Sequence, residues 1–430
     1  MIRPPSYAYR RAAAHSSRRA AAELCCDAVR LSSLAERHGT PLYVYSATAI
    51  RARLRAFAEA FRGVEHTLCY SVKANSSLAV LRLVAREGHG FDVVSGGELE
   101  RVLRASRSAA HATVFSGVGK TQREMQLALR SGILLFNLES ASELRALAEE
   151  AARHGRVAAV AVRVNPDLSA KTHPYISTGL HRHKFGVPIP EAERLYAAAA
   201  RERSLRVAGV SVHIGSQIAD TGSFGAAMER VAELVRRLRV QGHTIRYVDA
   251  GGGLAIPYEG AGQDFRKQLA AYARAVWRPL RGLGVRLLLE PGRSIVGPAG
   301  VLLTRVIYRK ANGGKRFLVV DAAMNDLLRP ALYNAHHEIV PVVRGWVAHE
   351  TVDVVGPVCE TGDFFARGRV LPALPEGGLL AILDAGAYAA SLGSNYNSRG
   401  KPAEILVDGK TARCIRRRES AADQMRLETF

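Results

Sequence analysis

The chain has 430 residues, of which 48% are hydrophobic and 23% charged, as is typical of a soluble globular enzyme that buries a sizeable core. This length predicts two domains unless a large barrel takes most of the chain. The net charge of +21 comes mostly from arginines in helix-like segments such as 51–55 and 236–239, where they alternate with Ala and Leu without aromatic stacking partners. We therefore expect solvated helix faces and an anionic substrate, and no nucleic-acid partner.

The cysteines and the apolar stretches exclude further classes of protein. The five cysteines show neither metal-ligand spacing nor a disulfide framework, so we expect a reducing compartment and no metal. No apolar stretch reaches the roughly eighteen residues of a membrane span, so we expect no membrane insertion.

The first 24 residues differ from the rest in composition. They are rich in Arg, Ala and Ser and contain one acidic residue, Glu23. This composition is typical of an organellar transit peptide or of a disordered basic extension. We expect residues 1–24 to be a disordered extension of a cytoplasmic protein, and organellar targeting stays open.

From Thr40 onward, short apolar runs alternate with segments of helical period. The predicted strands are Thr67–Val72, Phe91–Val94, Thr113–Phe115, Leu134–Asn137, Val157–Val164, Val207–His213, Ile245–Asp249 and Val285–Leu289. The predicted helices are Leu78–Glu87, Gly97–Arg107, Gln122–Ser131, Ala141–His154, Pro190–Glu202, Phe224–Gln241 and Phe265–Leu280. Eightfold alternation predicts an α/β fold with a parallel, TIM-like (β/α)8 barrel, to which we assign residues 46–298.

After about residue 300 the helical pattern ends. Short segments rich in β-forming residues follow, separated by Gly and Pro. The predicted strands are Val301–Tyr308, Phe317–Val320, His337–Val343, Thr351–Val355, Gly378–Leu383 and Ala403–Val407. We expect residues 25–45 and 299–430 to form a mainly antiparallel β domain that completes the active site.

Polar residues stand at the ends of the predicted barrel strands, where that fold places its chemistry. They are Lys73, Asp92, Asn137, Asn165, His213, Asp249 and Glu290. Desolvation lowers the pKa of an ammonium, and a partly neutral Lys73 could form a Schiff base with a carbonyl cofactor such as pyridoxal phosphate. Taken alone, Lys73 is better explained as a surface lysine, because lysine side chains are mostly exposed.

Two glycine-containing turns indicate an anionic cofactor. Gly251, Gly252 and Gly253 follow one strand and let backbone N–H groups surround a phosphate, and Gly292 with Arg293 follows the next strand. A carboxylate at Glu290 needs a partner, which could be a protonated pyridine nitrogen or Arg293. His213 could stack on a ring or be structural. The segment 116–121 is similar to a P-loop, but Val114 stands where its first glycine would be, so we reject an ATPase.

Seven segments in order resemble the motifs of the alanine-racemase-fold, fold type III pyridoxal-phosphate decarboxylases, over roughly residues 38–410. They are Tyr70-Ser-Val-Lys73-Ala-Asn, Phe91-Asp-Val-Val-Ser-Gly-Gly-Glu98, His213-Ile-Gly-Ser-Gln-Ile218, Gly251-Gly-Gly, Glu290-Pro-Gly-Arg293, Gly356-Pro-Val-Cys359-Glu360 and Gly386-Ala-Tyr388. Within the family the chain is most similar to members that act on diaminopimelate. Segments Lys171–Gly179 with Lys184–Gly186, Met324–Tyr333 and Ser394–Asn397 carry that similarity.

The resemblance implies pyridoxal 5′-phosphate as the cofactor and a role for each motif residue. Lys73 would bind the cofactor covalently, Glu290 would keep its pyridine nitrogen protonated and His213 would pack on its ring. The other implied cofactor-binding residues are Asp92, Ser216, Gly251, Gly252, Gly253, Gly292, Arg293 and Tyr388. Cys359 and Glu360 would complete the partner subunit's site, with Cys359 as proton donor and Glu360 as carboxylate for the distal ammonium, which requires a homodimer with shared active sites.

The resemblance also implies the substrate. Arg293, Arg329 and Tyr333, with Glu360 and Tyr388 nearby, would select a small diamino dicarboxylic acid, because a guanidinium pairs with a carboxylate and repels the distal ammonium of ornithine. We expect decarboxylation of meso-2,6-diaminopimelate to L-lysine and CO2. The alternatives are decarboxylation of carboxynorspermidine, ornithine or arginine, and a non-enzymatic cofactor-binding homologue. The chain departs from the family pattern at Ala323, Ala389 and Gly400.

Overall fold

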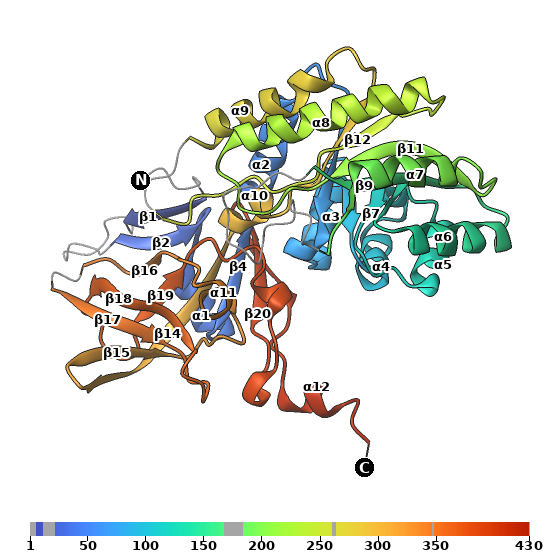
Figure 1. Cartoon of the computed structure of the whole chain (residues 1–430). Helices are drawn as coiled ribbons and strands as arrows, with labels where there is room; N and C mark the ends of the chain where they lie inside the picture. The colour runs from blue at the N-terminus through green and yellow to red at the C-terminus, as the bar shows by residue number, and fades with distance from the viewer. Residues whose placement is uncertain (1–5, 12–21, 167–183, 260–263, 346–347, 430) are drawn as a thin grey trace. The chain divides into compact units, whose positions relative to one another are not determined.

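The computed structural model describes residues 6–11, 22–166, 184–259, 264–345 and 348–429. It divides into two compact units (Figure 1). The barrel unit comprises Arg53–Ile256 and Gln263–Ser294, and the β unit comprises Met1–Ala52, Pro257–Gly262 and Ile295–Phe430.

Eight parallel strands close into a ring in the barrel unit. In order around the ring, β9, β11, β12, β13, β5, β6, β7 and β8 pair with their neighbours, and β8 pairs with β9. Their bounds are β5 His66–Ser71, β6 Gly90–Val93, β7 Thr113–Phe115, β8 Leu135–Leu138, β9 Ala158–Asn165, β11 Leu205–Val212, β12 Tyr247–Asp249 and β13 Arg286–Leu289. A short strand, β10 (Val187–Pro188), pairs with β9. The predicted (β/α)8 barrel is confirmed, and all eight predicted strands lie within two residues of the observed ones.

Helices alternate with these strands. They are α2 Ala47–Ala60, α3 Leu78–Arg86, α4 Gly96–Ala105, α5 Gln122–Ser131, α6 Ala141–Arg153, α7 Ile189–Ala199, α8 Thr221–Val240 and α9 Phe265–Trp277. Local chemistry sets several ends: Ser95 and Ser140 cap helix N-termini, and Thr121 forms a capping box with Glu124. The long helices α8 and α9 lie side by side (Figure 1), where Phe224 meets Tyr272 edge-on.

The barrel interior is apolar along most of the strands and polar at their carboxyl ends. Side chains from several strands form an apolar cluster: Cys69, Val114, Leu135, Ala159, Ala161, Ala208 and Leu288. All eight residues of β9 are buried, as expected of a parallel strand covered on both faces. Beyond this cluster, Asp92, Asn137, Asp249 and Glu290 are also buried. Buried polar groups require partners, so this layer is where chemistry can be positioned.

The β unit contains a mixed, mainly antiparallel sheet in the order β18-β17-β15-β14-β4-β20-β21, with β19 on β14 and β16 on β19. The strands are β4 Leu42–Ser46, β14 Gly300–Asn312, β15 Lys315–Val320, β16 Ile339–Pro341, β17 His349–Val355, β18 Phe364–Pro372, β19 Leu379–Ile382, β20 Ala403–Asp408 and β21 Thr411–Arg416. The pairs β15–β17 and β4–β20 are parallel. Strands β4, β18 and β21 were not predicted from the sequence.

The remaining described α-helices are short: α1 Leu31–His38, α10 Arg293–Val296, α11 Arg329–Tyr333 and α12 Ala421–Met425. In the part of the chain that the structure describes, no helix has the length and apolar character needed to cross a membrane.

We expected residues 1–24 to be disordered, but residues 6–11 and 22–24, which the structure describes, are largely in β-strands. Strand β1 (Tyr7–Arg11) pairs antiparallel with β2 (Ala22–Cys26), which pairs with β3 (Val29–Arg30). The buried Tyr7 hydroxyl lies 2.9 Å from Val44 O and 3.0 Å from Ala299 O. Composition did not reveal these strands, because their stabilising contacts come from residues distant in the chain.

Candidate active site

Lys73 lies in a single 3-10 turn, Val72–Ala74, that follows β5. Its Nζ lies 2.8 Å from Oδ2 of Asp92, the buried carboxylate on β6. Ser71 Oγ donates to the same oxygen at 2.7 Å. Burial opposes ionisation of Asp92, but the Lys73 ammonium and the hydrogen bonds from Lys73 and Ser71 hold the pKa of Asp92 below its usual value. The Lys73 side chain keeps 37% of its surface exposed, so a carbonyl compound can reach the amine.

Glu290 and Asp249 form a second buried group, at the ends of β13 and β12. Their side chains are hydrogen-bonded to each other, and Asn137 Nδ2 donates to Asp249 Oδ2 at 2.6 Å. Burial, then the nearby charges of Asp249 and Asp92, raise the pKa of Glu290 well above its ordinary value. Burial therefore favours the neutral form of Glu290 in the empty site, and a basic ring nitrogen placed beside it could share the proton.

Gly251–Gly253 form a cradle that only glycine can build. A Cβ on Gly252 would lie 2.2 Å from Glu290 O, and one on Gly253 would lie 2.2 Å from Gly215 O. Gly253 also has φ +103, a conformation that side chains rarely adopt. Gly252 N donates to His213 Nδ1 at 3.1 Å, and burial, with the charges of Arg163 and Lys73, lowers the pKa of His213 to about 3. His213 is thus a neutral imidazole with its proton on Nε2.

Arg293 supplies positive charge at this end of the barrel. It is 7% exposed, and its Nη2 donates to Ser216 Oγ at 3.1 Å. Gly292 packs against the Lys73 turn so closely that a Cβ there would lie 2.8 Å from Ala74 Cβ. The barrel residues therefore fit pyridoxal 5′-phosphate: they offer an amine for its aldehyde, a buried carboxyl group for its pyridine nitrogen, and glycine amides with a guanidinium and a hydroxyl for its phosphate.

The P-loop-like segment is structural. Lys120 is fully buried and donates to Glu143 Oε1 at 2.6 Å and to the carbonyl oxygens of Gly117 and Asn137 at 2.7 Å each. A lysine with these three partners has no donor left for a nucleotide, which agrees with the rejection of an ATPase.

The β unit contains the remaining predicted site residues. Cys359 and Glu360 are exposed, and Cys359 N donates to Asn397 Oδ1 at 2.9 Å. Tyr388 is half-buried with φ +53, a strained conformation for tyrosine that is common at ligand sites. Arg329 is buried at the start of α11 and Tyr333 is half-buried at its end.

A carboxylate that the sequence analysis missed joins two of these segments. Asp363 Oδ1 accepts from Met324 N and Oδ2 accepts from Val358 N, both at 2.7 Å. It thus connects the loop that leads to Arg329 with the loop that carries Cys359. An aspartate four residues after a candidate cysteine was visible in the sequence, but its two partners were not.

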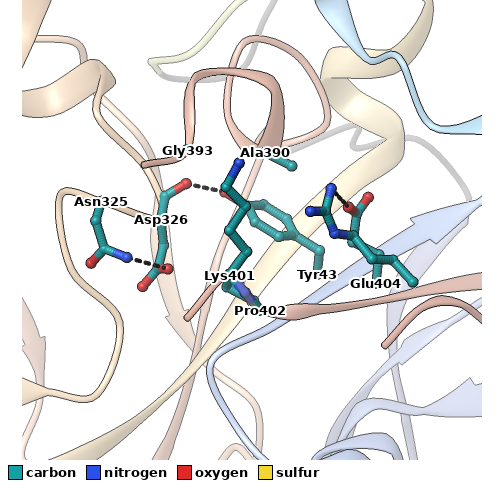
Figure 2. Close-up of a pocket in the computed structure, with 9 residues that line it drawn as sticks. Tyr43, Asn325, Asp326, Ala390, Gly393, Lys401, Pro402 and Glu404 are labelled. Atoms are coloured by element: carbon teal, nitrogen blue, oxygen red, sulfur yellow. Dashed lines mark hydrogen bonds and ion pairs between the residues drawn. The ribbon is translucent and has the colours of Figure 1, made fainter. Parts of the chain in front are cut away.

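The loop before α11 also borders a small pocket in the β unit (Figure 2). Tyr43 Oη donates to Asp326 O at 2.5 Å, and Asn325 Nδ2 donates to Asp326 Oδ1 at 3.1 Å. Burial raises the pKa of Asp326 to about 7. Of the segments singled out in the sequence, Lys171–Gly179 lies outside the described residues.

Comparison with known proteins agrees with this geometry. Residues 47–297 match the pyridoxal-binding domain of the pyridoxal-dependent decarboxylases. The chain is 52% identical to the diaminopimelate decarboxylase of Pseudomonas aeruginosa over 94% of this chain and 96% of that protein, and 48% identical to that of Neisseria meningitidis serogroup A over 94% and 98%.

Solved structures share the fold at lower sequence identity. The diaminopimelate decarboxylase of Helicobacter pylori in complex with L-lysine shares 41% identity, with a TM-score of 0.88 over 92% of this chain and 98% of that one. That of M. jannaschii with L-lysine shares 36% identity, with a TM-score of 0.92 over 100% and 99%.

Proposed function

Because this chain belongs to the pyridoxal-dependent decarboxylases and, among them, to the diaminopimelate decarboxylases, we propose how its residues perform that reaction. The reaction is the decarboxylation of meso-2,6-diaminopimelate to L-lysine and CO2 in lysine biosynthesis. The cofactor is pyridoxal 5′-phosphate, whose ring accepts the electron pair left when CO2 departs.

The barrel residues hold the cofactor in this proposal. Lys73 would bind its aldehyde carbon, and Asp92 would keep Lys73 in place. Ser216, Arg293 and the amides of Gly251–Gly253 would bind the phosphate, with Tyr388 as a further cofactor-binding residue. Neutral His213 would pack on the ring face without adding charge. The observation that supports this most strongly is the position of Glu290, a buried carboxyl group at the end of β13 that is hydrogen-bonded to Asp249 and could share a proton with the pyridine nitrogen.

The β unit binds the substrate. Arg329 and Tyr333, with Arg293, bind the carboxylate that the product retains, and Glu360 binds the distal ammonium. Cys359 delivers a proton to the carbon that has lost CO2. Cys359 and Glu360 act in the site of the partner subunit, so the enzyme is a homodimer with shared active sites, and we infer that it works in the cytoplasm.

Borohydride reduction followed by peptide mass spectrometry tests the cofactor assignment. The sequence contains nine lysines, so the labelled position is informative. We expect a pyridoxyl group on the peptide that contains Lys73. A label confined to any other lysine would overturn the proposal.

A further inference from the structure

Arg329 is held by two neighbouring side chains within the β unit. Its Nη1 lies 2.7 Å from Nε2 of His337, and its guanidinium carbon lies 4.2 Å from the centre of the Tyr258 ring. The Tyr258 ring also meets the His337 ring at 5.1 Å in an edge-on arrangement. Arg329 is 5% exposed and His337 is fully buried, so these contacts form away from water and restrict the guanidinium strongly.

The hydrogen bonds determine the protonation state of His337. Its Nδ1 lies 2.7 Å from Leu383 O, and a carbonyl oxygen only accepts, so Nδ1 carries a proton. A guanidinium only donates, so Nε2 must present its lone pair to Arg329. Both bonds form together only when the imidazole is neutral and protonated on Nδ1.

The backbone around His337 is fixed by the sheet. Leu383 N donates to Glu338 O at 2.9 Å next to the pairing of β16 with β19. Arg369 Nη1 donates to His337 O at 3.2 Å. The ring is therefore anchored to the end of β19, and its rotation by half a turn would place carbon atoms against both partners.

We propose that His337, supported by the Tyr258 ring, positions the Arg329 guanidinium for the carboxylate that the product retains. This inference rests on the proposed function, in which Arg329 binds that carboxylate. A neutral imidazole and an aromatic face orient a cation without cancelling its charge, whereas a carboxylate in the place of His337 would compete with the substrate. His337 thus sets affinity for the diacid and takes no part in the chemical step.

Two substitutions at position 337 separate this role from a general structural one. In His337→Asn, the amide can still donate to Leu383 O but leaves nothing at the position of Nε2. In His337→Gln, the longer amide can place its oxygen there and accept from Arg329. Tyr258→Leu removes the ring under the guanidinium, and Tyr258→Phe is its matched control, because it keeps the ring and loses only the hydroxyl.

The measurements compare ligands with and without the carboxylate. L-lysine retains it and cadaverine lacks it. For His337→Asn we expect the KM for diaminopimelate and the inhibition constant of L-lysine to rise about tenfold or more, the effect of one hydrogen bond to a charged group. The inhibition constant of cadaverine and the value of kcat should each change by less than about twofold. His337→Gln should retain most of the wild-type affinity for diaminopimelate and L-lysine. Tyr258→Leu should weaken the binding of both ligands as His337→Asn does, and Tyr258→Phe should not.

Each other outcome has a defined meaning. Wild-type activity together with unchanged lysine inhibition in both His337→Asn and Tyr258→Leu would overturn this inference alone. Equal loss of lysine and cadaverine binding would make the role structural and would also overturn it. A wild-type enzyme that neither converts diaminopimelate nor binds lysine would overturn the proposed function, and this inference with it. If His337→Asn fails to fold, the lysine and cadaverine inhibition constants of Tyr258→Leu decide between these outcomes.

Discussion

Lys73 Nζ lies 2.8 Å from Asp92 Oδ2, and Asp92 is fully buried. Removing the ammonium leaves a buried carboxylate without its cation, so Lys73→Ala should lower the melting temperature as well as abolish turnover. The double variant Lys73→Ala/Asp92→Asn should recover the melting temperature without recovering turnover. Lys315→Ala, a change at an exposed lysine, is the control and should leave both unchanged. Turnover by Lys73→Ala would contradict the account.

Glu290→Gln should separate stability from catalysis. Because burial raises the pKa of Glu290 and favours its neutral form, glutamine resembles it in shape and charge, and the melting temperature without cofactor should not fall. Turnover should fall roughly ten- to a hundredfold, since the amide cannot form a charge-assisted hydrogen bond with the ring nitrogen. Melting curves and kcat with saturating cofactor check both parts. Unchanged kcat would remove Glu290 from the mechanism.

Arg329→Ala should raise the KM for diaminopimelate by about ten- to a hundredfold, as expected from the loss of a charge-assisted pair. Ornithine provides the control within the same variant, because its chain ends in an ammonium and lacks the second carboxylate of diaminopimelate. Its weak binding should stay the same or improve. Equal weakening of both ligands would show that Arg329 supports the fold and does not select the diacid.

Mixed dimers test the shared sites. Neither Lys73→Ala nor Cys359→Ala dimers should be active, but one of the two sites in a mixed dimer would be intact if Cys359 enters the partner's site. Random mixing should then give about a quarter of the wild-type activity. Activity is measured after the two purified variants have been unfolded and refolded together. Absence of activity in every mixture, although mixed dimers form, would mean that each site is built from one chain.

Asp326 predicts a pH dependence of stability. Its pKa is raised from 3.8 to about 7, so the folded protein holds a proton that the unfolded chain releases between these values. The contribution is fully present below about pH 4 and is lost as pH rises through 7, and its size is at most about 4 kcal/mol. Asp326→Asn should therefore match the wild type in melting temperature at pH 4 and exceed it at pH 8. A lower melting temperature at pH 8 would contradict this assignment.

The barrel could be predicted from the sequence because its evidence is local. Each strand is an apolar run of a few residues, and Lys73, Asp92, His213, Asp249 and Glu290 stand directly at strand ends. Parallel strands of a closed barrel bring such ends together, so the position of each residue in its own strand was enough to place it.

The contacts that tune the site could not be predicted in this way. The hydrogen bond between Asp249 and Glu290, the two amides on Asp363 and the His337 contact of Arg329 all join segments whose spacing along the chain carries no periodic signal. Strand β1 was missed for the same reason, because the partners of Tyr7 are Val44 O and Ala299 O. These features depend on tertiary packing and become visible only in the fold.

The most direct test of the account is to supply the purified enzyme with pyridoxal 5′-phosphate and measure CO2 and L-lysine release from meso-2,6-diaminopimelate. Ornithine, arginine and carboxynorspermidine are assayed in parallel. We predict stoichiometric CO2 and lysine from diaminopimelate and no comparable turnover of the other three. Absence of lysine formation by an enzyme that has bound the cofactor at Lys73, or faster turnover of any of the other substrates, would contradict the central claim.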